Sequence, residues 1–194
     1  MFRKILNFLI VIYSINFIFA QAPYKYKCPT FEKCTDKNFI FDQETILGYY
    51  YPILKIPYYF ENGYKCSIFE FSKLPNKTIQ FDKYDLNEKT KRERQMYGIF
   101  QSSPNGTLSL KFTQFEFPMT FKIVTNKPEY FIALACHDCG IFSQGGKGIY
   151  GYAFSKVPWP SCELIKEMKR KMINCGIGKH FIKHEIQDGC SRCS

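Results

Sequence analysis

Most of the chain between Gly48 and Phe154 consists of short stretches in which apolar and polar residues alternate, separated by turn residues. The stretch Thr107–Thr113 (TLSLKFT) alternates without a fault, and Thr78–Asp82 (TIQFD) does so over a shorter span. A period of two is typical of a strand with one face buried and the other face in water. The pattern therefore predicts an all-β protein with antiparallel strands.

Six further stretches have the length and the residue types of strands. They are Gly48–Lys55, Tyr64–Ser72, Gln95–Gln101, Met119–Thr125, Glu129–Cys136 and Lys147–Phe154. Eight strands at this spacing are typical of a barrel or a sandwich. An immunoglobulin-like sandwich would bury a tryptophan between two cysteines, whereas Trp159, the only tryptophan, lies between two prolines after the strands. We therefore expect an eight-stranded up-and-down β-barrel, which has room for one small ligand.

The pattern changes to that of a helix after Pro160. Ser161 can cap the helix at its start and Gly176 at its end. Apolar side chains then recur on one helical stripe, at Leu164, Ile165, Met168 and Met172. We expect one C-terminal α-helix packed outside the barrel, followed by a short ninth strand near Lys179–Lys183.

Residues 1–20 (MFRKILNFLIVIYSINFIFA) have the arrangement of a secretory signal peptide. Two basic residues precede the apolar run Ile5–Phe19, and the small Ala20 follows it. Polar residues interrupt this run, which falls short of the ~18 unbroken apolar residues that a membrane span needs. We therefore expect cleavage after Ala20, secretion to the extracellular space, and a single domain over residues 21–194.

All nine cysteines lie after this leader, and in an exported chain they indicate disulfides. Because nine is odd, at least one thiol is left over and could join a disulfide-linked partner. The pairs Cys136–Cys139 and Cys190–Cys193 have the spacing of a zinc site. Zinc would need four reduced thiolates in an oxidising compartment, so we expect no metal.

Charge and sequons add to the picture of an exported protein. The formal net charge is +10, or about +8 without the two basic residues of the leader. The basic runs Lys89–Arg94 and Lys166–Lys171 occur without any nucleic-acid-binding motif. We expect them to be solvated faces, with no nucleic-acid partner and only weak association with membrane or lipoprotein surfaces. Asn76 and Asn105 begin sequons beside turn residues and are the predicted glycosylation sites.

Three motifs resemble the signatures of the lipocalins. Gly48–Ile53 (GYYYPI), with Ile56–Gly63 (IPYYFENG) and Cys66, is similar to the first signature and most similar to the apolipoprotein D-like branch. Thr125–Cys136 (TNKPEYFIALAC) resembles the second signature, and Ser155–Pro158 (SKVP) resembles the third. The three occur in the family's order, and the resemblance covers almost all of the mature chain.

The resemblance implies particular residue pairs. Tyr50 and Lys156 stand where the family has tryptophan and arginine, so they would form the aromatic–cation pair at the closed base of the barrel. The family's disulfides would be Cys28–Cys136 and Cys66–Cys190, with Cys34 and Cys193 as rivals of Cys28 and Cys190. The pairing of Cys34, Cys139, Cys162, Cys175 and Cys193 stays open, except that Cys162 and Cys175 cannot bridge each other across the helix, because they lie about 20 Å apart along it.

Pro52 departs from the expected first strand. Proline has no amide hydrogen and removes one donor from the hydrogen-bond ladder. We expect a bulge or a missing bond there, which would loosen one side of the barrel.

The resemblance implies that the barrel binds or transports a small hydrophobic ligand, such as a fatty acid, a sterol-like lipid, a retinoid or a pigment, without a cofactor and without catalysis. The candidate cavity residues are those on the apolar strand faces: Ile79, Phe81, Leu108, Leu110, Phe112, Phe121, Ile123, Tyr150, Tyr152 and Phe154. Two alternatives stay open. One is a secreted interaction or defence protein with a filled barrel and a basic exterior, and the other is a thiol-dependent enzyme acting through Cys34 or Cys139.

Overall fold

The computed structural model of the chain describes residues 30–36, 39–57, 61–76, 78–112, 119–136, 148–185 and 187. The predicted signal peptide and four of the cysteines, Cys28, Cys139, Cys190 and Cys193, lie outside these residues, as does the side chain of Phe112. Among the described residues, no helix is long and apolar enough to cross a membrane.

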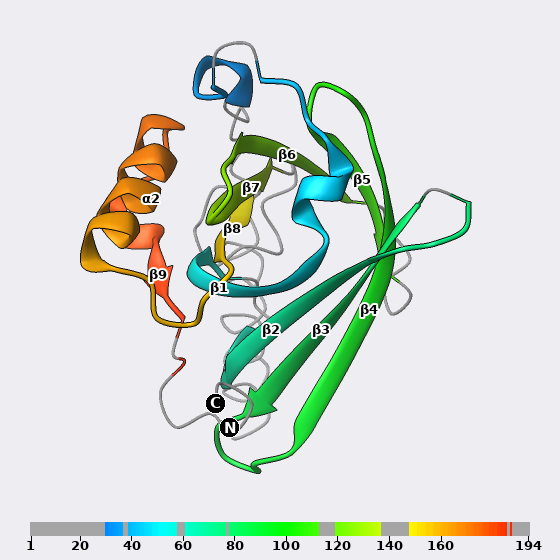
Figure 1. Cartoon of the computed structure of the whole chain (residues 1–194). Helices are drawn as coiled ribbons and strands as arrows, with labels where there is room; N and C mark the ends of the chain where they lie inside the picture. Colours follow the sequence, from blue (N-terminus) through cyan, green and yellow to red (C-terminus); the bar gives the residue numbers. More distant parts are fainter. Residues whose placement is uncertain are drawn as a thin grey trace, which may run out of the picture.

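Eight antiparallel strands form a closed barrel, in which each strand pairs with the next and β1 pairs with both β8 and β2 (Figure 1). The strands are β1 (Gly48–Ile56), β2 (Tyr64–Lys73), β3 (Ile79–Asn87), β4 (Glu93–Ser102), β5 (Thr107–Phe112), β6 (Met119–Asn126), β7 (Tyr130–Cys136) and β8 (Ile149–Ser155). The predicted up-and-down barrel is confirmed.

The helix α2 (Cys162–Asn174) lies outside the barrel beside the short strand β9 (Lys183–His184), which pairs with β1 (Figure 1). The predicted ninth strand is therefore present but shifted. Residues Lys179–Phe181 form the 3₁₀ turn η4 instead, and its hydrogen bond from Phe181 N to Gly178 O is a turn contact rather than a sheet contact.

Alternation along the strands separates two apolar clusters. In β7, Phe131, Ala133 and Ala135 belong to the cluster inside the barrel, whereas Tyr130, Ile132 and Leu134 belong to the cluster outside it. Both faces of β7 are therefore buried, which explains why its sequence is apolar at nearly every position. The apolar stripe of α2 packs in this outer cluster.

The predicted helix begins where its cap was expected. Ser161 Oγ accepts a hydrogen bond from Leu164 N at 3.2 Å. Met168 and Met172 are fully buried in the outer cluster, together with the disulfide between Cys34 and Cys175. Cys34 is thus not the partner of Cys136. Because its sulfur is in a disulfide, it is also not available as the nucleophile of a thiol-dependent enzyme. Cys66 and Cys136 are also disulfide-bonded, and their predicted partners lie outside the described residues.

One end of the barrel is closed by the segment that precedes β1. The 3₁₀ turn η2 (Gln43–Ile46) crosses this end (Figure 1, cyan). Phe41 N donates to Pro104 O at 3.0 Å, and Ser102 Oγ donates to Gln43 Oε1 at 3.1 Å. Because strands alternate in direction, the turns that follow β2, β4 and β6 meet at this closed end. The connections that follow β1, β3, β5 and β7 meet at the other end, called the mouth below.

Pro52 coincides with an irregularity in β1, as predicted. The register of β1 against β8 shifts between Pro52 and Leu54. Among the described residues, β1 pairs with β2 through Gly48, Tyr49 and Tyr50 alone, and beyond them its pairing changes to β9. A gap in the sheet therefore opens between β1 and β2 on the mouth side of Pro52.

The C-terminal segment fills this gap. The side-chain amide of Gln187 donates to Pro52 O at 3.4 Å and to Ser67 O at 3.2 Å, so that it bridges the two strands. Glu185 N donates to Ile53 O at 3.0 Å. Carbonyl groups that a regular ladder would have satisfied are thus satisfied by the tail.

Removing the amide that bridges the gap should destabilise the barrel. Replacing Gln187 by alanine leaves two buried carbonyls without this donor, and we expect the free energy of unfolding to fall by about 1–3 kcal/mol. Urea unfolding measures the change. The control is Gln101→Ala on the exposed side of β4, which should change stability by less than about 0.5 kcal/mol. Equal stability of the two variants would contradict the role given to Gln187.

The disulfide of the outer cluster should also stabilise the fold. It joins residues 141 positions apart, and it restricts the unfolded chain accordingly. We expect the double variant Cys34→Ala/Cys175→Ala to lose about 2–4 kcal/mol of unfolding free energy in urea titrations. Cys162 is free and exposed, so Cys162→Ala serves as the matched control and should unfold like the unmodified protein.

Candidate ligand-binding site

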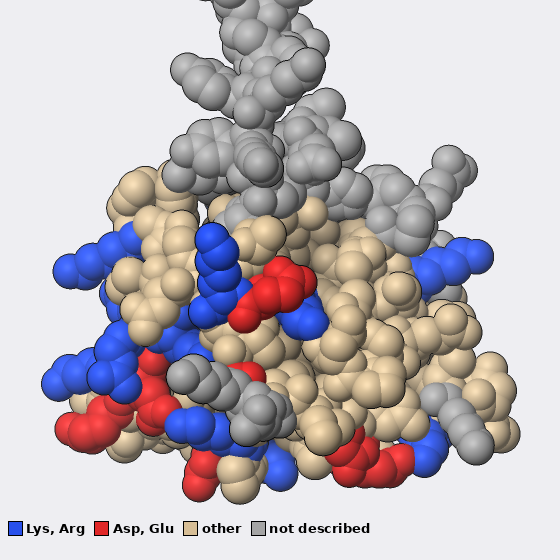
Figure 2. Space-filling model, turned by 90° about the horizontal axis from the view of Figure 1, so that it is seen from above, with Lys and Arg blue, Asp and Glu red and all other residues tan. Residues whose placement is uncertain are grey.

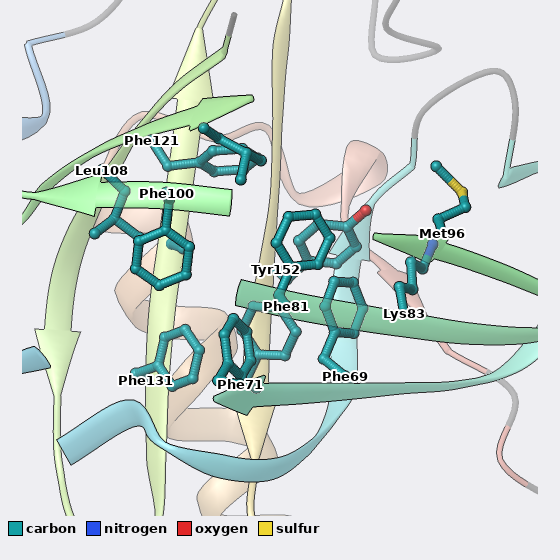
Figure 3. A pocket seen from close by; sticks show the side chains of 13 residues that line it. Phe69, Phe71, Phe81, Lys83, Met96, Phe100, Leu108, Phe121, Phe131 and Tyr152 are labelled. Atoms are coloured by element: carbon teal, nitrogen blue, oxygen red, sulfur yellow. The ribbon is translucent and has the colours of Figure 1, made fainter. Parts of the chain in front are cut away.

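The barrel interior contains an apolar cavity (Figure 3). Its lining residues are Phe69, Phe71, Phe81, Lys83, Met96, Phe100, Leu108, Leu110, Phe121, Phe131, Ala133, Tyr152 and Phe154. The free space measures about 50 Å³ for the centre of a water-sized sphere. The cavity is therefore small, and twelve of the thirteen described side chains that line it are apolar or aromatic.

The candidate cavity residues fall into three groups. Six of them line the cavity: Phe81, Leu108, Leu110, Phe121, Tyr152 and Phe154. Ile79, Ile123 and Tyr150 are buried in the same interior cluster but do not line the free space. The side chain of Phe112 lies outside the described residues.

Seven lining residues were missed by the sequence analysis: Phe69, Phe71, Lys83, Met96, Phe100, Phe131 and Ala133. Most of them follow the same period of two, as Phe69 and Phe71 do in β2 and Met96 and Phe100 do in β4. Lys83 was missed because the apolar alternation of β3 ends at Phe81. The strand continues for six residues past Phe81, and its next inward positions are the buried charged residues Lys83 and Asp85.

The predicted base pair lies at the closed end. Lys156 Nζ is 5.9 Å from the centroid of the Tyr50 ring, a distance at which a cation–π contact is weakly favourable. Tyr50 is buried, its ring packs edge-on against Phe131 at 4.9 Å, and its hydroxyl donates to Thr45 O in η2 at 2.9 Å. Tyrosine at this position thus links the floor of the cavity to the segment that closes the barrel.

A network of buried charges adjoins the cavity on its mouth side. Lys83 forms an ion pair with Glu61, and its Nζ lies 3.4 Å from Asp85 Oδ1. Tyr152 Oη donates to Glu61 Oε1 at 2.7 Å. Arg94 pairs with the second oxygen of Asp85. One face of the network, formed by Lys83 and Tyr152, therefore belongs to the cavity wall.

The network extends to the C-terminal segment that fills the gap. Ser67 Oγ lies 2.7 Å from Asp85 Oδ1 and 2.9 Å from Glu185 Oε1, so it connects the two carboxylates. Glu185 also forms an ion pair with Lys55 of β1. The charged side chains of the network come from β1, β3, β4, the segment after β1 and the tail, and they converge where β1 and β2 separate.

Burial and ion pairing shift the pKa values of these groups in opposite directions. Burial alone would lower the pKa of Lys83, but the Glu61 and Asp85 carboxylates outweigh it and raise the pKa. Burial alone would raise the pKa of Asp85, but Lys83, Arg94 and the Ser67 hydroxyl lower it below its ordinary value. Burial raises the pKa of Glu185, and Lys55 offsets only part of this effect. Lys83 and Asp85 therefore stay charged across the physiological pH range.

Basic and acidic side chains are interspersed on one face of the molecule. On the face shown in Figure 2, lysines and arginines lie next to aspartates and glutamates. The sequon residues Asn76 and Asn105 are exposed in the turns after β2 and β4. No group of three or more histidine, cysteine, aspartate and glutamate side chains suitable for a metal ion occurs among the described residues.

Neutralising Asp85 should change both the stability and its pH dependence. Asp85 has a lowered pKa in the folded state, so its contribution is present above the unfolded pKa near 4 and is lost as the pH falls below it. We expect Asp85→Asn to cost about 3–5 kcal/mol at neutral pH, because Lys83 and Arg94 lose a buried partner. We also expect the variant to lose less stability than the unmodified protein between pH 5 and pH 2.

The control is Asp82→Asn on the same strand. Asp82 is on the opposite face of β3, where it accepts hydrogen bonds from Gln80 and Gln95. Urea unfolding at several pH values measures the free energy of unfolding of the unmodified protein and of both variants. An acid-induced loss that is equally large in Asp85→Asn and in the unmodified protein would exclude Asp85 as its source.

Several solved structures have the same fold. Lobster apocrustacyanin A1 is 14% identical, with a TM-score of 0.67 over 87% of this chain and 94% of that chain. Insecticyanin from the tobacco hornworm Manduca sexta is 18% identical, with a TM-score of 0.66 over 87% of this chain and 90% of that chain. A biogenic amine-binding protein is 13% identical, with a TM-score of 0.58 over 82% of this chain and 89% of that chain.

Sequence comparisons add no closer relationship, since neither a protein-family model nor a curated protein matches the chain. At such low identities the structural similarity establishes the architecture alone. That architecture, a closed eight-stranded antiparallel barrel with one helix and an extra strand outside it, is the lipocalin fold.

Proposed function

We propose that this chain is a secreted lipocalin that binds and transports a small hydrophobic ligand in its barrel, without catalysis and without a cofactor. The observation that carries the proposal is the interior cavity, whose lining among the described residues is apolar or aromatic except at Lys83. An apolar ligand gains ~25 cal/mol for each Å² of surface that it buries in such an environment. One structural neighbour is a biogenic amine-binding protein, which is consistent with a small ligand.

The dimensions of the cavity limit the ligand. A free space of about 50 Å³ for the centre of a water-sized sphere suits a slender chain better than a rigid ring system. Phe131 and Phe154 stack with centroids 4.6 Å apart, and Phe69 lies edge-on to Phe154 at 4.9 Å. A wider ligand would have to separate these rings, so we favour fatty-chain ligands over sterol-like lipids and pigments.

The same rings support a second candidate function. A barrel whose aromatic side chains fill most of its interior could be a rigid scaffold, and the protein would then act as an interaction or defence protein through its exterior. Most of the two basic runs lies on the surface, since Lys89–Glu93 are exposed, as are Lys166 and Arg170 of α2. Arg94 is the exception to the expected solvated face, because it pairs with the buried Asp85. The basic exterior is also the part of the molecule that we propose for weak association with membrane or lipoprotein surfaces.

Four finer statements belong to this proposal. They are the similarity to the apolipoprotein D-like branch, cleavage after Ala20, glycosylation at Asn76 and Asn105, and the disulfides Cys28–Cys136 and Cys66–Cys190. The exposure of both asparagines supports glycosylation, and the bonded state of Cys66 and Cys136 supports the two disulfides. The free and exposed Cys162 is the candidate for a disulfide-linked partner.

Filling the cavity should weaken ligand binding without unfolding the protein. We expect Leu108→Trp, which introduces an indole into the cavity, to weaken binding of a hydrophobic fluorophore by about tenfold or more, with an overpacking cost of about 1–3 kcal/mol in stability. Ser109→Trp is the matched control, because Ser109 is the next residue on β5 and is exposed. Fluorescence titration measures binding, and circular dichroism checks the fold.

The titration also separates the two candidate functions. If the unmodified protein binds the fluorophore and only Leu108→Trp loses it, the ligand occupies the barrel. If the unmodified protein binds no hydrophobic probe and releases no lipid on denaturation, the barrel is filled and the scaffold function is favoured.

A further inference from the structure

We propose that a groove on the outer face of the barrel binds small free cations of the quaternary ammonium class, such as choline. The described residues that line the groove are Tyr49, Tyr51, Ile68, Glu70 and Tyr84, and they surround a space of about 550 Å³. None of them lines the interior cavity. The inference is therefore a second site, independent of ligand binding inside the barrel.

The groove lies where the outer cover of the barrel ends. In β2, Phe69 and Phe71 line the cavity, so Ile68 and Glu70 lie on the outer face. Figure 1 shows α2 beside β1 and β9, on the side of the barrel away from β3 and β4. Tyr51 packs against the edge of the outer apolar cluster to which α2 contributes. The groove therefore begins beside this cluster and continues across β2 to β3.

The charge of the groove is negative. Glu70 is its only charged lining residue within the described part of the chain, and it lies directly opposite Asp82 on β3. Like charges in such cross-strand positions repel each other. Neither carboxylate takes part in an ion pair between described residues, and the partners of Asp82 are the neutral amides of Gln80 and Gln95. This face therefore attracts a cation.

The groove also offers aromatic surface. Three of its lining residues are tyrosines, and Tyr49 is 58% exposed, so a ligand can reach its ring. The nearby Glu70 carboxylate raises the pKa of the Tyr49 hydroxyl, through hydrogen bonding and through its charge. An aromatic ring and a carboxylate thus lie together at one side of the groove. Both attract cations, the ring through its quadrupole and the carboxylate through its charge.

The chemistry of the lining favours a quaternary ammonium ion over a primary one. A primary ammonium group is compact and strongly hydrated, and its three N–H donors need acceptors. A quaternary ammonium group has no N–H donor, and its methyl groups gain by contact with the tyrosine rings and Ile68. A phosphate attached to the ligand would meet the charges of Glu70 and Asp82. We therefore favour free cations over phosphocholine head groups.

The first test compares four small probes by NMR titration of the full-length protein. They are choline, its neutral isostere 3,3-dimethyl-1-butanol, ethanolamine and phosphocholine. We expect choline to bind about tenfold tighter than each of the others, which corresponds to about 1.4 kcal/mol. The amide resonances of Tyr49 and Glu70 should shift. Equal or tighter binding of the isostere or of phosphocholine, or no binding of choline, would overturn the inference.

A charge-neutralising variant tests the role of the carboxylate. Glu70→Gln keeps the shape of the side chain and removes its charge, so choline should bind about fivefold more weakly while the neutral isostere is unaffected. Glu88→Gln is the matched control, because Glu88 is exposed in the turn after β3 and does not line the groove. An equal effect of the two variants on choline would show that only the overall charge of the protein matters, and the inference would fail.

A second variant tests the aromatic surface and covers the case in which Glu70→Gln does not fold. Tyr49→Leu removes one exposed ring from the groove, and choline should bind about threefold more weakly. Tyr97→Leu is the matched control: Tyr97 is 46% exposed and lies opposite Asp82 on β4, but it does not line the groove. If choline binds equally to Tyr49→Leu and Tyr97→Leu, the groove is not its site.

A third variant separates the groove from the barrel. Leu108→Trp fills the interior cavity and should leave the affinity for choline unchanged, because Leu108 lines the cavity and not the groove. Loss of choline binding in this variant would place the cation inside the barrel and refute the outer site. Binding of the hydrophobic fluorophore decides the proposed function separately, whatever the result with choline.

Discussion

The closure of the barrel depends on one strand, β1, which has to pair with both β8 and β2. Pro52 cannot donate to a ladder, and the register of β1 shifts beside it. The pairing with β2 ends at Tyr50, and the C-terminal segment completes the wall with backbone, amide and carboxylate groups from Glu185 and Gln187. The charged network at the mouth exists because a gap in a sheet exposes polar groups that must find partners.

The same constraint gives the cavity its chemical character. Where the sheet is regular, alternate side chains pack an apolar interior, and the cavity wall consists mostly of phenylalanines and leucines. Where β1 leaves β2, the inward positions of β3 change from Phe81 to Lys83 and Asp85. A cavity with an apolar floor and a charged rim is therefore a direct result of how this barrel is closed.

Much of the fold could be predicted because a period of two and a helical stripe are local signals. Thr107–Phe112 and the apolar face of α2 were recognised from neighbouring residues alone. The extent of β3 was not, since Lys83 and Asp85 look like surface residues until their partners are known. The pairing of Cys34 with Cys175 was also left open, because residues 141 positions apart carry no local sign of their contact.

The sequence by itself determined the eight-stranded architecture, the start of the helix at Ser161, the irregularity at Pro52 and six of the residues that line the cavity. These features follow from side-chain alternation, from capping and from the missing amide of proline, all of which act within a few residues. Only the tertiary structure decided the size of the cavity, the partners of Lys83 and the closure of the gap by Gln187. Those depend on Glu61, Asp85 and the C-terminal segment meeting across the barrel, and a buried charge becomes stable only when such distant partners converge on it.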